Sequence, residues 1–189
     1  MLNIGVGSGI FEEMATKKGL DVYSLDPNPR SIDTIRARFS VRTKAQVGYV
    51  QSIPYPSDFF NAVVVSEVLE HLSDEALDDG LREIHRVLVK GGYLLGTVPS
   101  RENLKEQIVV CPECGKRFHR WGHLQSFDPA RVRALLSPYF QVEEIRERPF
   151  VTWPTLNWKG KILVLAKVLL YQFGIHGNNE TLVFMATKR

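Results

Sequence analysis

Near its amino terminus the chain reads Asn3-Ile4-Gly5-Val6-Gly7-Ser8-Gly9, between a short apolar run at 2–6 and a helical pattern at 10–18. Glycines at alternate positions let the backbone turn tightly and approach a ligand without a clash from a Cβ atom. A helix that starts beyond them presents unpaired N–H groups. The stretch therefore predicts a strand, a ligand-contacting glycine loop and a helix.

The spacing of these glycines separates two nucleotide-binding interpretations. A dinucleotide fingerprint places three glycines in the pattern G-x-G-x-x-G. Here the third glycine, Gly9, arrives one residue early, and Ile10 occupies the expected place. The spacing argues against NAD. A G-x-G-x-G loop also occurs in turns that bind nothing, so the surrounding sequence has to decide.

A carboxylate follows the second predicted strand. Asp26 ends the strand-like stretch 21–25 and precedes a strong turn signal at Pro27. Ligands of open α/β sheets lie across the carboxyl ends of the strands, and a carboxylate there can accept both hydroxyls of a ribose. We interpret Asp26 as a ribose ligand. The alternative is a side chain that caps its own turn.

Strand-like and helix-like patterns alternate through residues 1–100, which predicts a doubly wound α/β sheet with right-handed crossovers. The run 62–66 is β-branched, as is typical of a strand buried on both faces. The second half adds a helix and two strands. Expected strands beyond residue 40 are 45–50, 62–66, 93–98, 140–148 and 181–188, and expected helices are 31–39, 74–89 and 129–136.

Five segments in this order resemble the class I S-adenosylmethionine-dependent methyltransferases, in the broad group that contains ubiquinone-biosynthesis enzymes. They are 2–9, 23–27, 51–63, 66–72 and 86–94. The resemblance implies a Rossmann-like, mostly parallel sheet of seven strands with the last strand antiparallel. It also implies that S-adenosylmethionine donates a methyl group to a small-molecule acceptor.

The resemblance implies a role for each segment. The glycine loop would wrap the methionine part of the cofactor, a carboxylate would hold the ribose, three residues would border the adenine, and two would lie near the sulfonium. The implied cofactor-binding residues are Asn3, Gly5, Gly7, Gly9, Asp26, Gln51, Ser52, Ile53, Ser66 and Glu67. Three amides depart from the family: Asn3 replaces its usual acidic residue, Gln51 stands near a common Asp, and Asn61 replaces the common Asp after Phe60.

The family has no universal catalytic residue, because positioning supplies much of the catalysis at an activated methyl carbon. A base is needed only where the acceptor must lose a proton. His71 and His123 are the candidates in this chain, since an imidazole titrates near neutral pH. His71 could equally be a structural residue at the start of a helix, so the catalytic residue stays open.

The second strong signal lies in the segment 101–127, which we interpret as an insert. Cys111, Cys114, His119 and His123 follow the spacing C-x2-C-x4-H-x3-H. Two thiolates and two imidazoles match a closed tetrahedral zinc site. In the competing interpretation the cysteines form a metal-free turn, and the two histidines face the acceptor pocket.

Length and composition favour one methyltransferase domain over residues 1–189, with a second, apolar helical insert at 150–178. The segment 159–173 is too short to span a bilayer, so a lid, a dimer contact or a peripheral membrane contact are its alternatives. The chain has no secretory signal pattern, and we expect a cytoplasmic location. The sequence does not specify the oligomeric state.

Charge is unevenly distributed. Residues 1–100 hold 10 Lys and Arg against 13 Asp and Glu, whereas residues 101–189 hold 14 against 8. The basic second half could face an anionic acceptor or be an ordinary solvated surface. Three functions stay open: a methyltransferase acting on a sugar, lipid or quinone-like molecule, an RNA methyltransferase that uses the Cys/His insert, and a non-catalytic scaffold. Nucleic acid is the less favoured partner.

Overall fold

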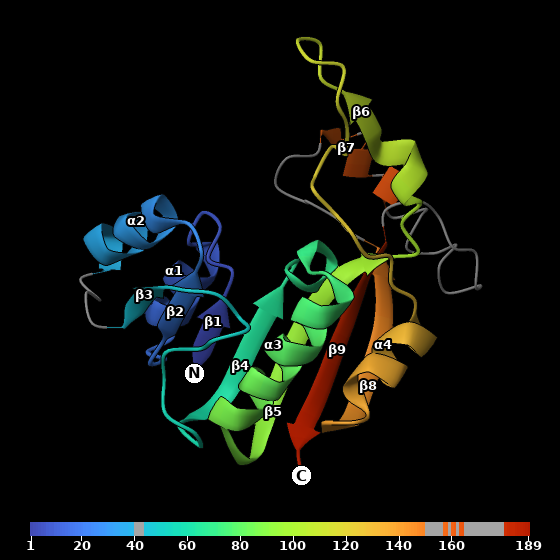
Figure 1. Ribbon diagram of the computed structural model, residues 1–189. Helices are drawn as coiled ribbons and strands as arrows, with labels where there is room; N and C mark the ends of the chain where they lie inside the picture. The colour runs from blue at the N-terminus through green and yellow to red at the C-terminus, as the bar shows by residue number, and fades with distance from the viewer. Residues whose placement is uncertain (40–43, 150–156, 159, 162, 165–179) are drawn as a thin grey trace.

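The computed structural model describes residues 1–39, 44–149, 157–158, 160–161, 163–164 and 180–189. Figure 1 shows a twisted sheet flanked by helices, with a small two-stranded hairpin beyond the carboxyl ends of its parallel strands. The larger sheet has seven strands in the order β3-β2-β1-β4-β5-β9-β8. Their bounds are β1 Leu2–Ile4, β2 Tyr23–Asp26, β3 Ala45–Val47, β4 Phe60–Ser66, β5 Leu88–Ser100, β8 Phe140–Pro149 and β9 Glu180–Lys188.

Strands β1 to β5 are mutually parallel, whereas β9 is antiparallel to both of its neighbours, β5 and β8. The expected seven-stranded, mostly parallel sheet with an antiparallel last strand is confirmed. The strand order reverses beside β1, because the chain runs outward from β1 to β3 and then returns to place β4 on its other side. Such a switch point is where open α/β sheets bind ligands.

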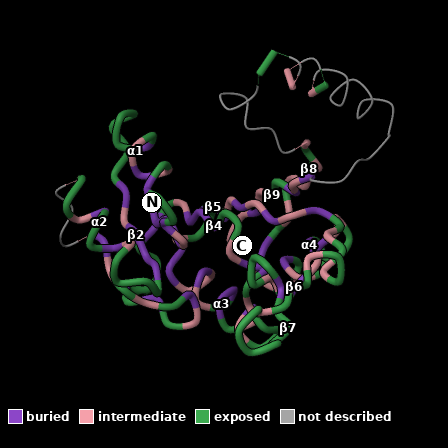
Figure 2. Tube along the Cα trace, turned by 90° about the horizontal axis from the view of Figure 1, so that it is seen from above, coloured by how far each residue is buried: buried purple, intermediate pink, exposed green. Residues whose placement is uncertain are grey.

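Within 1–39 and 44–149, the α-helices that flank the sheet are α1 Ile10–Lys17, α2 Pro29–Phe39, α3 Asp74–Val87 and α4 Pro129–Leu136. Seen from above, α1 and α3 lie on opposite sides of the sheet, and buried residues follow the strands between them (Figure 2). The N-cap of α3 is Ser73, whose hydroxyl accepts a hydrogen bond from the Ala76 N–H. The inward face of α3 buries Leu77, Leu81 and Ile84, spaced three and four residues apart.

The boundary between α3 and β5 differs from the sequence-based expectation. The periodic pattern predicts a helix through Val89, but α3 ends at Val87 and β5 begins at once with Leu88. Leu88 is fully buried and pairs with Phe60 of β4. The strand register then shifts, and Gly91 adopts a φ of +73°. Burial of Leu88 therefore overrides the helical pattern.

A substitution at Gly96 of β5 would test how tightly the core is packed. A Cβ built at this position would lie 2.2 Å from Cζ of Phe184 and 2.7 Å from the carbonyl oxygen of Val65. Because a backbone atom blocks one side, the neighbours cannot simply rotate away. We expect Gly96→Ala to lower the free energy of unfolding by about 1–3 kcal/mol. Urea denaturation measures it, and an unchanged midpoint would contradict the packing.

The insert at 101–127 contains the turn η2 Leu104–Gln107 and the hairpin of β6 Ile108–Val110 with β7 Arg117–His119. The apolar segment 159–173 lies almost entirely outside the described residues, as does most of the insert expected at 150–178. Among the helices that the structure describes, none is long and apolar enough to cross a membrane.

Candidate functional site

The glycine loop joins β1 to α1 in left-handed backbone conformations. Gly5, Gly7 and Gly9 have φ values of +83°, +51° and +79°, which L-residues with a Cβ atom adopt only at a cost. Space is also limiting at two of them. A Cβ on Gly5 would lie 2.5 Å from Cγ2 of Val68, and one on Gly9 would lie 2.5 Å from Cδ1 of Ile35.

Asp26, at the carboxyl end of β2, is 8% exposed and faces this loop. Its Oδ2 accepts a hydrogen bond from the Val6 N–H at 2.9 Å, and its Oδ1 accepts one from the Asn28 N–H at 2.8 Å. The side chain therefore does cap its own turn, as the alternative interpretation held. Each carboxylate oxygen has a second lone pair, so the same geometry leaves acceptor capacity for a ribose.

The Asn3 side chain forms a hydrogen bond within the protein. It is buried, and its Nδ2 donates to Oε1 of Glu12 at 2.7 Å, an oxygen that also accepts from the Ser24 hydroxyl at 2.9 Å. Glu12 lies in the first turn of α1 and is 3% exposed. The acidic group that the family usually has at the position of Asn3 is thus present in the same cluster, supplied by Glu12.

A cavity of about 450 Å³ opens beside the loop and Asp26, at the switch point of the sheet. It is lined by Ile4, Gly5, Pro27, Gly48, Tyr49, Val50, Gln51, Val68, His71, Leu72, Ser73, Ala76 and Leu124. Oε1 of Gln51 is buried and has no hydrogen-bond partner among the described residues. An unsatisfied buried acceptor is costly, so this oxygen calls for a donor on a bound molecule.

The three residues expected to border the adenine lie in different surroundings. Gln51 lines the cavity, whereas Ser52 is exposed and Ile53 is buried in the core, where its N–H donates to Oε2 of Glu83 at 2.8 Å. The loop after β3 instead contributes Gly48, Tyr49 and Val50. The sequence analysis placed these three residues in a strand over 45–50, whereas β3 ends at Val47.

Ser66 and Glu67 lie at the carboxyl end of β4. The Ser66 hydroxyl is 2.8 Å from the Thr97 hydroxyl, which donates to Oε1 of Glu67 at 2.8 Å. Glu67 has a φ of +54°, an uncommon value for a residue with a side chain, and such strain concentrates at functional sites. Neither residue lines the first cavity; Glu67 lines a second one.

This second cavity, of about 520 Å³, shares His71 with the first. Its lining is rich in carboxylates and imidazoles, together with one indole. The lining residues are Glu67, His71, Pro99, Glu102, Trp121, His123, Glu180 and Thr181. The candidate cofactor cavity and this second cavity are therefore neighbours that share the His71 side chain as a lining residue.

The segment 122–125 brings His123 to His71. The 3₁₀ turn η1, Leu69–His71, leaves carbonyl groups that the turn itself does not use. The carbonyl oxygen of Glu70 accepts from the N–H groups of Leu124 at 2.7 Å and Gln125 at 3.1 Å. The His71 and His123 rings then lie edge to face, with centroids 4.8 Å apart.

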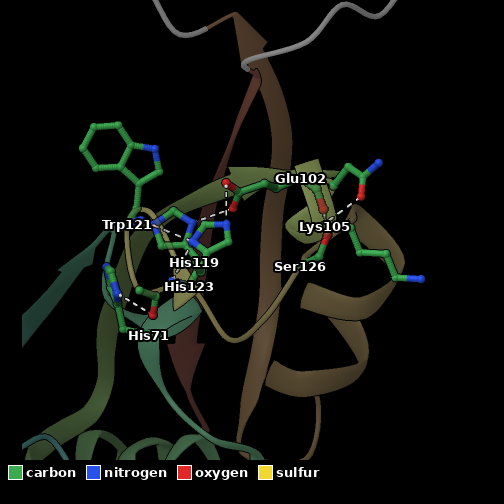
Figure 3. Close-up of polar contacts among 9 residues, drawn as sticks. His71, Glu102, Lys105, His119, Trp121, His123 and Ser126 are labelled. Carbon is green, nitrogen blue, oxygen red and sulfur yellow. Dashed lines mark hydrogen bonds and ion pairs between the residues drawn. The ribbon is translucent and has the colours of Figure 1, made fainter. Parts of the chain in front are cut away.

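Glu102 holds two histidines from the insert (Figure 3). Nδ1 of His123 lies 2.5 Å from its Oε2, and Nε2 of His119 lies 3.6 Å from its Oε1. The His119 and His123 rings stack with centroids 4.9 Å apart. Burial lowers the pKa of His71, which favours the neutral imidazole.

Glu70 is the residue that sequence reasoning missed. It is fully buried, and neither carboxylate oxygen has a hydrogen-bond partner among the described residues. Burial, aided by the neighbouring carboxylates of Glu67 and Glu102, raises the pKa of Glu70 to about 8. Only its position in the segment 66–72, beside His71, could have indicated it.

The structure does not bring the four expected zinc ligands together. Cys111 lies at the turn end of the β6–β7 hairpin, where its N–H donates to the Lys116 carbonyl, whereas His119 pairs with Ile108 at the opposite end. Three residues of strand separate Lys116 from His119, or about 10 Å. Two groups of three described residues could hold a metal, and neither contains Cys111 or Cys114.

The cysteines form a turn of their own. The Gly115 N–H donates to the Cys111 carbonyl at 2.9 Å, and Gly115 has a φ of +69°. The backbone N–H groups of Cys114 and Glu113 lower the pKa of the Cys111 thiol. These contacts resemble the inward-pointing N–H groups of a metal knuckle, but they involve only the two cysteines. The geometry does not support a zinc site formed by all four residues.

The strand order, the left-handed glycine loop and the buried carboxylate after β2 together define a Rossmann-like domain that binds a nucleoside-containing cofactor. Comparison with known proteins narrows this class. A family model described as a methyltransferase domain matches residues 2–96. The chain belongs to the class I S-adenosylmethionine-dependent methyltransferase family.

Two curated relatives illustrate the similarity. An uncharacterized methyltransferase of Mycobacterium tuberculosis is 32% identical over 140 residues, which cover 74% of this chain and 53% of that protein. A ubiquinone biosynthesis O-methyltransferase of Methylocella silvestris is 29% identical over 109 residues, which cover 56% of this chain and 41% of that protein. The chain spans about half the length of the curated relatives it matches.

Solved structures support the fold. A crystal structure of an S-adenosylmethionine-dependent methyltransferase from Methanosarcina mazei superposes with a TM-score of 0.71 and 18% sequence identity. The match covers 99% of this chain and 91% of that one. At this identity the likeness extends to the fold alone.

Proposed function

We propose that this protein transfers a methyl group from S-adenosylmethionine to a hydroxyl group of a neutral or cationic small molecule. The observation that carries the proposal is the pair of neighbouring cavities that share His71. One is lined by Gly5 of the glycine loop and by Pro27, the residue after Asp26, as expected of a cofactor site. The other has room for a separate acceptor.

The residues of the first cavity fit the cofactor. Asp26 retains lone pairs for the ribose hydroxyls, and the buried Oε1 of Gln51 complements the exocyclic amino group of an adenine. Gly5 and Val68 line the cavity side by side, so closely that a Cβ on Gly5 would lie 2.5 Å from Cγ2 of Val68. When bound, S-adenosylmethionine supplies a methyl carbon activated by a positively charged sulfur.

The second cavity favours a small acceptor that carries no negative charge. Glu67, Glu102 and Glu180 line it, so the phosphates of RNA would meet carboxylates of like sign. Trp121 is 62% exposed at its rim and offers an aromatic face for stacking. A quinol-like ring or a sugar with free hydroxyl groups matches this lining.

The residues of the site would act by positioning. With S-adenosylmethionine bound, the acceptor oxygen would form a bond to the methyl carbon as the carbon–sulfur bond broke with its electron pair left on sulfur, and the hydroxyl proton would pass to water. Holding both molecules in line beside His71, which lines both cavities, would convert the encounter into an intramolecular step.

Incubation with deuterated-methyl S-adenosylmethionine and a metabolite extract tests this function. We expect one labelled methyl group on a hydroxylated small molecule, identified by fragment mass, and no label in a parallel reaction with total RNA. Label in RNA, or S-adenosylmethionine binding without transfer to any metabolite, would contradict the proposal. A protein that binds no S-adenosylmethionine would favour the scaffold alternative.

A further inference from the structure

The Glu70, His71 and His123 side chains each place one ligand atom within 4.8 Å of the others. Two imidazoles and a carboxylate are a common ligand set for divalent transition metals. The three residues come from η1 and from the segment that docks on it, so hydrogen bonds between backbones fix their spacing. Protonation of the rings decides whether they can bind a metal.

Both histidines have a free nitrogen lone pair. A carbonyl or carboxylate oxygen accepts hydrogen bonds, so the ring nitrogen facing it carries the proton. Nδ1 of His71 faces the Gly122 carbonyl oxygen at 3.3 Å, and Nδ1 of His123 faces Glu102 Oε2 at 2.5 Å. In a neutral ring this leaves Nε2 unprotonated. Metal-binding histidines are typically held in this way, through the nitrogen that does not bind the metal.

The same assignment of protons to ring nitrogens excludes the other candidate group, Glu102 with His119 and His123, as a metal site. Nδ1 of His119 accepts hydrogen bonds from the N–H groups of His123 at 3.0 Å and Trp121 at 3.4 Å. Nδ1 therefore carries no proton, and Nε2 of the neutral ring does. That nitrogen has no lone pair for a metal. His119 instead directs an N–H toward Glu102, which in turn orients His123.

Glu70 supplies the independent sign of a missing cation. Glu70 is 0% exposed, and both of its carboxylate oxygens are buried without a hydrogen-bond partner among the described residues. A buried carboxyl group without a hydrogen-bond partner either stays protonated or is compensated by a cation. The carboxylates of Glu67 and Glu102 add like charge nearby, and a divalent cation would offset all three.

We propose that Glu70, His71 and His123 bind a divalent transition-metal ion of the zinc, cobalt or manganese class, with Glu102 as the group that orients His123. Three protein ligands leave coordination positions open, as in catalytic sites. His71 and His123 both line the second cavity. On the proposed function, an acceptor hydroxyl in that cavity would bind the metal, lose its proton to water and present an oxygen nucleophile.

Cobalt(II) titration of the chelator-treated full chain, followed by absorption, tests the metal site directly. We expect one tightly bound ion with visible ligand-field bands and without the near-ultraviolet charge-transfer band of a cobalt–thiolate bond. The double variant Cys111→Ser with Cys114→Ser is the matched control, and it should keep these bands because it leaves the His/Glu cluster intact.

Unlike the cysteine control, substitutions in the His/Glu cluster or at Glu102 should weaken cobalt binding. Glu102→Gln should weaken cobalt binding by roughly 10- to 100-fold, the size expected for a group that orients a ligand. Glu70→Gln and His123→Ala should weaken it further. Loss of binding in the cysteine variant with retention in His123→Ala, or no cobalt binding by the intact protein, would overturn the assignment.

Different results would contradict the metal assignment and the proposed function. Neither Glu70 nor His123 lines the first cavity, so Glu70→Gln should bind S-adenosylhomocysteine within about twofold of the parent while cobalt binding is reduced. Retained S-adenosylhomocysteine binding also shows that the variant is folded. Cobalt binding without S-adenosylhomocysteine binding would contradict the function and leave the metal site standing.

Discussion

Asp26→Ala should weaken the binding of S-adenosylhomocysteine by roughly 100- to 10,000-fold. Two ribose hydroxyls that donate to one carboxylate form charge-assisted hydrogen bonds, each contributing about 1.5–3 kcal/mol. Their combined loss corresponds to about two to four orders of magnitude in the dissociation constant. Isothermal titration calorimetry measures the change.

Asp26 also has structural contacts, so the prediction needs two controls. Asp33→Ala on α2 removes an exposed carboxylate paired with Arg36 and should leave the affinity unchanged. Asp26→Asn keeps one acceptor oxygen, for the N–H group of either Val6 or Asn28, and should be more stable than the alanine variant, yet still bind weakly. Equal affinity in all three variants would mean that the ribose lies elsewhere.

Gly5→Ala should lower the free energy of unfolding by about 2–5 kcal/mol and abolish measurable cofactor binding. Two costs add at this position: a side chain in the left-handed region costs about 1–2 kcal/mol, and overpacking costs about 1–3 kcal/mol. The new methyl group would lie 2.5 Å from Cγ2 of Val68, and Gly5 and Val68 both line the first cavity.

Gly7→Ala is the matched comparison. Gly7 has a similar left-handed conformation, but a Cβ there would have no atom within 4 Å. We expect only the conformational cost of about 1–2 kcal/mol. Thermal and urea denaturation of both variants separate the two costs, and equal destabilisation would show that the contact with Val68 is relieved by a small shift.

The fold and the cofactor loop were predictable because their signals are local. Glycine spacing fixes the backbone of 5–9, and the β-branched run 62–66 fixes β4 in any context. The early end of α3 was not predictable, since burial of Leu88 against β4 depends on contacts that periodicity does not encode. The whole-chain domain assignment and the role of 159–173 stay predictions.

The metal interpretation shows the limit of spacing as evidence. Cys111, Cys114, His119 and His123 are close in sequence, but the register of β6 with β7 places the cysteines and His119 at opposite ends of a hairpin. His123 instead meets His71, 52 positions earlier, because the Glu70 carbonyl accepts hydrogen bonds from Leu124 and Gln125. Such long-range pairing cannot be read from one segment alone.

A crystal structure of the protein with S-adenosylhomocysteine would test the central claim most directly. The predicted complex has both ribose hydroxyls on Asp26, the adenine amino group on Oε1 of Gln51, and the sulfur facing His71 from the first cavity. Electron density for the nucleoside at another place, or Asp26 without contact to the ribose, would contradict the account.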